Sequence, residues 1–280
     1  DASIEGAGLA AADARLDDLL APELLTLPLR ALLKKAGDAL DGAYPMDLRT
    51  IRATPLPSES GAFAQQLQQM ATAFGINNLE AYVSTTLGPS CVPASAAPPR
   101  LVFGSVLLDK DVDENARTFL VLRSLKLLQS RSAALSRAAP IDLWPMVAGM
   151  LSVFAPSWQA PGVDAKKVAE HQQRLKTALV RELDGDVPVL AMEVIGSIGN
   201  RASQLGTAVN QWGNRTALLA MGSPATALRG IALGTGHPEG PPEDAAERLK
   251  WIVRNPEARD IAVFSVSEQY SDARRRLTLG

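Results

Sequence analysis

Strand-like and helix-like hydrophobic patterns occupy separate parts of this chain. Apolar and polar residues alternate within 46–56, residues 79–86 are rich in β-branched and aromatic side chains, and the apolar segment 100–108 follows two prolines. These patterns are typical of β-strands. From residue 112 to the end, apolar residues recur instead at helical spacing. We therefore predict an α+β fold that is mostly helical, with a small antiparallel sheet in the N-terminal third.

Glycine, proline and capping residues divide the helical part into segments. A further helix, SESGAFAQQLQQMATAFG (58–75), is expected between the first two strand segments, because it has serine caps, an apolar stripe and a closing glycine. The other expected helices cover 112–130, 141–154, 163–183, 187–206, 207–220, 222–229, 242–254 and 264–276.

The first 43 residues are rich in alanine and leucine, and Leu29, Leu32, Leu33 and Leu40 are spaced as on one helix. The chain begins with Asp1 rather than methionine, which is typical of a fragment of a longer protein. We therefore interpret 1–43 as an N-terminal helical arm or linker and 44–280 as the main domain.

Composition argues against several classes of partner. The formal net charge is −2, whereas a nucleic-acid binder normally has a basic surplus. The longest apolar stretch, residues 144–158, contains two prolines and is too short to span a bilayer. Cys91 is the single cysteine, so no intrachain disulfide can form. We expect no nucleic acid, no membrane insertion and a cytoplasmic location.

Conventional catalytic motifs are missing from the sequence. The two histidines, His171 and His237, are far apart and belong to no HExxH pattern, although a zinc site needs roughly three or four converging ligands. His171 lies in a polar amphipathic segment and is expected to be exposed. No GxSxG elbow is present, but a Ser-His-Asp triad is defined by geometry and stays open here. We predict no catalytic residue, no metal and no cofactor.

One arginine interrupts an otherwise apolar helix face. In FLVLRSLKLLQS (119–130), Arg123 falls in one arc with Ala116, Phe119, Leu120 and Leu127. An unpaired buried charge lowers the stability of a fold by an amount on the order of several kcal/mol. Arg123 must therefore reach a cleft, or contact a carboxylate or a carbonyl.

Three segments together resemble a known peptidase family. They are PPRLVFGSVLL (98–108), FLVLRSLKL (119–127) and GNRTALLAMGSPATAL (213–228). Their order is similar to that of the M48 family of gluzincin peptidases, in which an edge strand covers the HExxH helix and a later helix carries E-x-x-x-D. The closing phrase DIAVFSVSEQYSDARRRLTLG (260–280) resembles that of domains at the C-termini of large bacterial TPR-repeat proteins.

The resemblance implies a zincin-like core without metal in a peptidase-like domain over 44–280. The family's metal ligands and catalytic residues would fall on residues that cannot hold or use zinc, and an arginine would be retained. In chain order, the matched positions are Arg123, Ser124, Leu127, Asn210, Asn214 and Arg215.

We therefore expect a non-catalytic protein-interaction or scaffolding domain, the C-terminal part of a larger TPR-type protein with a protein partner. The alternative is an enzyme or small-anion binder that reuses the vacated cleft around Arg123. In either case the two matched helices should face each other, with Arg123 near the Asn210–Asn214 turn. The segment 260–280 should be an integral part of the domain.

Overall fold

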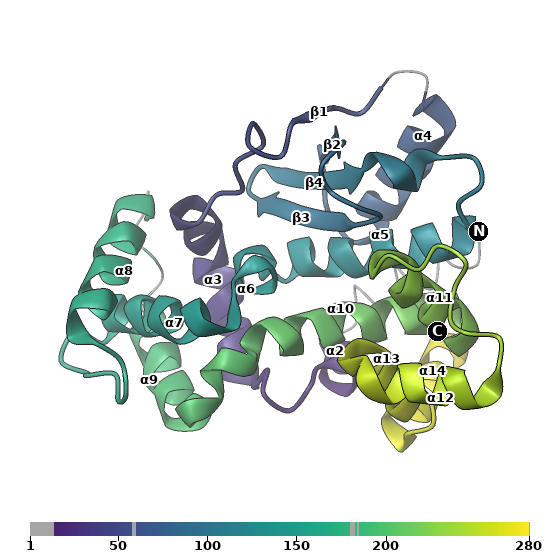
Figure 1. Cartoon of the computed structure of the whole chain (residues 1–280). Helices are drawn as coiled ribbons and strands as arrows, with labels where there is room; N and C mark the ends of the chain where they lie inside the picture. Colours follow the sequence, from purple (N-terminus) through teal and green to yellow (C-terminus); the bar gives the residue numbers. More distant parts are fainter. Residues whose placement is uncertain (1–13, 58–59, 180–182, 184, 280) are drawn as a thin grey trace.

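A computed structural model of the chain describes residues 14–57, 60–179, 183 and 185–279 (Figure 1). Helices make up most of this part, and the strands are confined to 53–104. The predicted α+β class is therefore confirmed. Within the described ranges, no helix combines the length and apolar character that a membrane span requires.

The sheet is mixed, and the prediction of an antiparallel sheet was wrong. Its strands are β1 (Ala53–Pro55), β2 (Glu80–Ser84), β3 (Cys91–Ala96) and β4 (Pro99–Gly104), in the order β1-β2-β4-β3. β1 pairs antiparallel with β2, and β3 with β4, but β2 and β4 are parallel. The chain reverses its direction before β3 and again after it, so β4 returns beside β2 with the same direction. β3 was not predicted, because CVPASA lacks an alternation of large apolar residues.

Each expected helix has a counterpart in the structure, although several bounds differ. The helix expected over 187–206 ends at Ile198 and continues as a 3-10 turn, η3 (Gly199–Gln204). The helix expected over 264–276 begins only at Glu268, and the helices Ala133–Arg137 and Pro256–Phe264 were not predicted. The helices are α2 (Ala14–Leu20), α3 (Leu27–Ala43), α4 (Gly61–Ala73), α5 (Glu114–Gln129), α6 (Ala133–Arg137), α7 (Pro140–Phe154), α8 (Ala165–Ala178), α9 (Val187–Ile198), α10 (Leu205–Met221), α11 (Pro224–Gly234), α12 (Ala245–Arg254), α13 (Pro256–Phe264) and α14 (Glu268–Leu279), with a short 3-10 turn, η2 (Ser105–Leu108), after β4.

Helix α5 is the central element of the molecule. It packs against β3 on one side and against α10 and α11 on the other, and α4 also contacts it. Figure 1 shows the sheet above α5 and the long helix α10 below it, with α7, α8 and α9 at one end and α11 to α14 at the other. α5 and α10 are the two helices that the resemblance expects to face each other.

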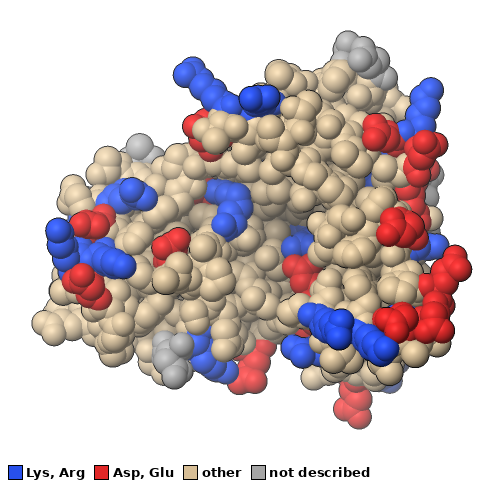
Figure 2. Space-filling view, viewed as in Figure 1, with Lys and Arg blue, Asp and Glu red and all other residues tan. Residues whose placement is uncertain are grey.

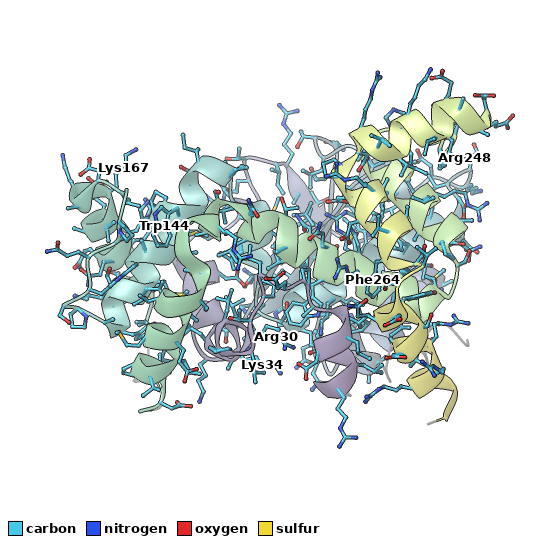
Figure 3. The ribbon with its side chains drawn as sticks, turned by 90° about the horizontal axis from the view of Figure 1, so that it is seen from below. Arg30, Lys34, Trp144, Lys167, Arg248 and Phe264 are labelled. Carbon is cyan, nitrogen blue, oxygen red and sulfur yellow. The ribbon has the colours of Figure 1, made fainter. Side chains whose placement is uncertain are left out.

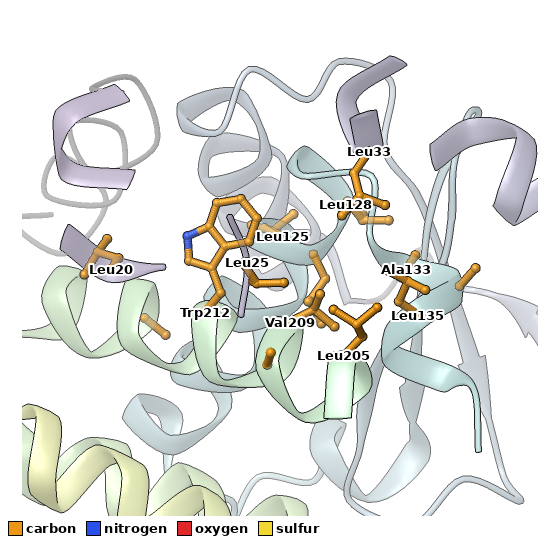
Figure 4. Close-up of a cluster of buried hydrophobic side chains, with 14 of the residues drawn as sticks. Leu20, Leu25, Leu33, Leu125, Leu128, Ala133, Leu135, Leu205, Val209 and Trp212 are labelled. Carbon is orange, nitrogen blue, oxygen red and sulfur yellow. The ribbon is translucent and has the colours of Figure 1, made fainter. Parts of the chain in front are cut away.

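Residues 14–43 belong to the common core rather than to a separate arm. Leu20, Leu25 and Leu33 are buried together with Trp212 of α10 (Figure 4), and each such side chain contributes about 2 kcal/mol through burial. Lys126 of α5 is also buried, and its Nζ bonds to the carboxylate of Asp17 in α2 at 2.5 Å. The charge of Lys126 is tolerated because the N-terminal helix pairs it. The rest of the expected arm, residues 1–13, lies outside the described part.

The C-terminal segment is integrated in the domain, as predicted. Phe264, Tyr270 and Ala273 are buried, and α14 packs against α2 and α10. α13 and α14 are separate helices because residues 265–267 form a turn, in which the Ser267 Oγ accepts the N–H of Tyr270 at 3.2 Å.

Candidate functional site

Arg123 is paired with a carboxylate from a distant helix. Its Nη1 and Nη2 donate to Oε2 and Oε1 of Glu257 at 2.8 and 2.9 Å. The side chains of Arg123 and Glu257 are 18% and 23% exposed, so the pair lies at the wall of a hollow rather than in the core. Glu257 lies in the first turn of α13, and two parallel hydrogen bonds are the strong form of an arginine–carboxylate interaction. The arginine on the apolar face of α5 is therefore explained by its partner on α13.

The helices α5 and α10 approach closely beside Arg123. A Cβ atom on Gly213 would lie 2.9 Å from the Arg123 carbonyl oxygen and 3.1 Å from its Cγ. Only glycine leaves room for this approach without a shift of one helix. The structure thus brings together the two helices that the resemblance matched.

A cavity of about 550 Å³ opens next to the Arg123–Glu257 pair. Side chains from α5, α10, α11, α12 and α13 line it, including Arg123, Asn210, Trp251 and Arg254. We call it the Arg123 cavity. Arg123 and Asn210 are the two sequence-predicted site residues that it contains.

Two other predicted residues serve the packing of α5. The Ser124 hydroxyl is fully buried and donates to the Cys91 carbonyl of β3 at 2.8 Å. Leu127 is 2% exposed and belongs to the hydrophobic core. Neither residue lines the Arg123 cavity.

The remaining two residues follow Asn210 on α10. Asn214 is fully buried, and neither atom of its amide has a hydrogen-bond partner among the residues that the structure describes. Arg215 donates from Nε and Nη2 to Asp260 at 3.0 and 2.6 Å, and its guanidinium lies 4.6 Å from the centre of the Phe264 ring. Arg215 therefore fastens α10 to α13 and does not contribute to the Arg123 cavity.

The matched positions do not form a metal site. Arg123, Ser124, Leu127 and Asn210 offer a cation, a hydroxyl, a hydrocarbon and an amide, none of which is a usual zinc ligand. Within the described residues, no group of three or more His, Cys, Asp or Glu could hold a metal ion. The nearby thiol of Cys91 is no substitute, because burial raises its pKa to about 12.

The edge strand β3 is bonded to side chains of the protein itself. The Cys91 carbonyl accepts from Ser124, the Pro93 carbonyl accepts from Arg137 at 2.6 Å, and the Ala96 N–H donates to Asp41 at 2.8 Å. Pro93 also has no N–H to offer. These groups are not free to pair with an added peptide strand.

A second cavity, of about 580 Å³, was not predicted from the sequence. It lies between the residues that follow α3 and the helices α6, α7 and α8, and Tyr44, Arg137, His171 and Arg174 line it. We call it the Tyr44–His171 cavity. Figure 2 shows basic atoms at the wall of a hollow near the middle of this face, between the sheet and α7 and α8.

His171 is not the exposed residue that the sequence predicted. Its ring is half-buried, and its Nδ1 lies 2.5 Å from the Tyr44 hydroxyl oxygen. Burial, and secondarily the charge of Arg174, lowers the pKa of His171, while burial raises the pKa of Tyr44 to about 12. Tyr44 and His171 are 127 residues apart, and no local pattern could have indicated their contact.

Helix α12 has an amphipathic sequence but no buried residue. Leu249 and Val253 are 62% and 56% exposed, and their spacing of four places them on one face of the helix. Trp251 and Arg254 of the same helix line the Arg123 cavity. The same helix therefore carries an exposed apolar strip and, on another side, part of the cavity wall.

Comparison with known proteins gives no match. No family model fits the chain, and no curated protein or solved structure is significantly similar to it.

Proposed function

We propose that this chain is a non-catalytic protein-interaction domain with a peptidase-like outline, the C-terminal part of a larger scaffold protein. The observation that carries the proposal is the pair between Arg123 and Glu257. At the position that the resemblance gives to a zinc-binding histidine, both terminal nitrogens of Arg123 bond to Glu257. The side chain at this position joins α5 to α13, which is a structural role.

The neighbouring positions support the same proposal. Ser124 bonds to β3, Leu127 packs in the core, and Arg215 joins α10 to α13. Arg123, Ser124 and Leu127, which stand where the resemblance gives metal-binding or catalytic groups, therefore have bonding or packing roles in this fold. The side-chain bonds of β3 also leave fewer backbone groups for a peptide in extended conformation.

The proposed interaction surface is the Arg123 cavity together with the exposed strip of α12. Figure 3 shows α12, labelled at Arg248, at the outer margin of the molecule, with side chains directed into solvent. Leu249 and Val253 offer apolar contact, and Arg254 at the cavity wall offers a positive charge. This combination fits a partner segment with apolar residues next to an acidic one.

Photo-crosslinking tests the proposed surface. A photo-crosslinking residue in place of Leu249 or Val253 should capture the same partner protein in cells that carry the full-length protein. The same residue in place of Ile141, which is 81% exposed on α7, is the control and should not capture it. Adding Arg254→Glu to the Leu249 probe should reduce the capture. Equal capture from all three positions would contradict the proposal.

A second candidate function is binding of a small anion in the Arg123 cavity, or a reaction on it. The presence of Arg254 in that cavity favours it, but an anion would have to compete with Glu257 for Arg123. Metal analysis of the purified chain and a peptidase assay test whether the chain instead hydrolyses peptides with zinc. Stoichiometric zinc with chelator-sensitive cleavage would overturn the non-catalytic proposal.

A further inference from the structure

The Tyr44–His171 cavity is separate from the Arg123 cavity and carries its own chemistry. Tyr44 follows α3, Arg137 ends α6, and His171 and Arg174 share one side of α8. The cavity volume of about 580 Å³ is within the range of roughly 300–1,000 Å³ that is typical of small-molecule sites.

Arg174 contacts an aromatic ring, and its N–H groups have no hydrogen-bond partner within the described residues. Its guanidinium lies over the Tyr44 ring, 5.2 Å from the ring centre, a cation–π contact that does not use its N–H groups. In the part of the chain that the structure describes, no hydrogen bond or ion pair of Arg174 is found, and its side chain is exposed. Its five N–H donors can therefore bind an oxyanion.

Arg137 adds a second positive charge deeper in the cavity. Its Nη1 and Nη2 donate to the carbonyl oxygens of Pro93 and Tyr44 at 2.6 and 3.0 Å, and Asp41 lies 3.7 Å from Nη2. Asp41 offsets part of this charge, and the exposed Asp142 at the cavity wall offsets part of that of Arg174. The formal charges of these two arginines and two aspartates cancel, so a bound anion would depend on the directed N–H donors of Arg174 rather than on a net positive charge.

The pair of Tyr44 and His171 adds neutral polar groups. When the Tyr44 hydroxyl donates to Nδ1, the hydrogen of the neutral imidazole is on Nε2 and remains available to a ligand. Met146, which is 3% exposed, and Ala138 add apolar surface to the lining. The cavity thus combines arginine side chains with apolar surface.

We propose that the Tyr44–His171 cavity binds a small organic anion. Arg174 and Arg137 hold its carboxylate or phosphate group, and Met146 and Ala138 contact its apolar part. The apolar part of the lining and the volume of the cavity favour a small molecule with an apolar part over an acidic protein segment. This site is independent of the proposed partner surface on α12.

Calorimetric titration at constant ionic strength tests the proposal with phenyl phosphate, benzoate and inorganic phosphate as probes. Phenyl phosphate or benzoate should bind saturably, and phenyl phosphate more tightly than inorganic phosphate. Arg174→Gln should weaken binding of phenyl phosphate about tenfold or more, as expected for loss of a charge-assisted bond. Lys176→Gln removes the same charge from the opposite side of α8 and should change the affinity less than about twofold.

His171→Gln serves as a second variant, because a glutamine can keep a bond to Tyr44 while it alters the polar wall. It should also weaken phenyl phosphate binding, and amide shifts in NMR spectra should gather on α8 and around Tyr44. The proposal is overturned if neither organic probe binds saturably, or if inorganic phosphate binds more tightly than phenyl phosphate. Equal weakening by Arg174→Gln and Lys176→Gln, or binding of a glutamate-rich peptide alone, would also overturn it.

Discussion

Arg123 of α5 and Glu257 of α13 are joined by two hydrogen bonds although 134 residues separate them. The pair connects the central helix to the C-terminal helices at the edge of the Arg123 cavity. Because less than a quarter of either side chain is exposed, solvent screens their attraction less than that of a surface pair.

A double-mutant cycle measures the coupling energy between Arg123 and Glu257. We expect Arg123→Met and Glu257→Gln to show a coupling of about 1–2 kcal/mol in the free energy of unfolding in urea, because each single change leaves a part-buried group unpaired. The exposed pair of Glu247 and Lys250 on α12 is the control, with a coupling below about 0.5 kcal/mol. Equal couplings would mean that the Arg123 pair is effectively solvated.

The amide of Asn214 is predicted to destabilise the fold. We expect Asn214→Leu to raise the free energy of unfolding by about 1 kcal/mol, because it removes a buried polar group without bonds inside the described structure. Thr216→Val is the matched control, since Thr216 is equally buried but donates to the Trp212 carbonyl at 2.9 Å. Thr216→Val should lower the free energy of unfolding by about 1 kcal/mol. A loss of stability in Asn214→Leu would indicate a bound water or ligand at the amide.

A substitution at Gly213 tests the close approach of α5 and α10. We expect Gly213→Ala to lower the free energy of unfolding by about 1–3 kcal/mol, because the added methyl group meets the Arg123 backbone. Gly196→Ala on α9 meets no atom within 4 Å and should instead stabilise by about 0.5–1 kcal/mol through helix propensity. Thermal and urea unfolding check both, and a neutral Gly213→Ala would contradict the close contact.

Asp41 makes stability depend on pH. Burial raises its pKa from 3.8 to about 6, against the charge of Arg137 and the backbone N–H of Ala96. The folded chain therefore holds this proton more tightly than the unfolded one, and the resulting stability is full below about pH 4 and lost as the pH rises through 6. At about 1.4 kcal/mol per pKa unit, the loss is about 3 kcal/mol.

Urea unfolding at a series of pH values checks this contribution. In Asp41→Asn, the decrease in the free energy of unfolding between about pH 4 and pH 7 should become smaller. Asp47→Asn is the control, because Asp47 is exposed and its Thr50 and backbone bonds lower its pKa; it should leave the fall in place. A fall that persists in Asp41→Asn would assign the pH dependence to other groups.

Phe264 tests whether the C-terminal helices are part of the core. It is 3% exposed and contacts Tyr270 and Arg215, so Phe264→Ala should cost about 3 kcal/mol. Val263, its neighbour, is 65% exposed, and Val263→Ala should change stability by less than about 0.5 kcal/mol. Calorimetric melting compares the two. Similar small effects would indicate that α13 and α14 are only loosely attached.

The candidate site was predictable in part. The apolar arc around Arg123 showed that this residue needs a partner or a cleft, and the resemblance indicated α5 and α10 as facing helices. The partner, Glu257, could not be identified, because 242–280 contains several carboxylates and no local pattern says which of them meets Arg123. The Tyr44–His171 cavity was missed because His171 lies in a polar helix whose pattern is typical of a surface position.

Local sequence determined the class and the helix positions of this protein. Hydrophobic period and capping residues act over a few neighbours. The helices expected over 112–130, 163–183 and 242–254 accordingly begin close to the expected positions, after the N-caps Asp113, Asp164 and Asp244. Tertiary structure decided the parallel pairing of β2 with β4, the burial of Lys126 against Asp17, and the separation of Ser124 and Leu127 from the Arg123 cavity. These features depend on which distant residues meet when the core closes, and no pattern within a short segment specifies that meeting.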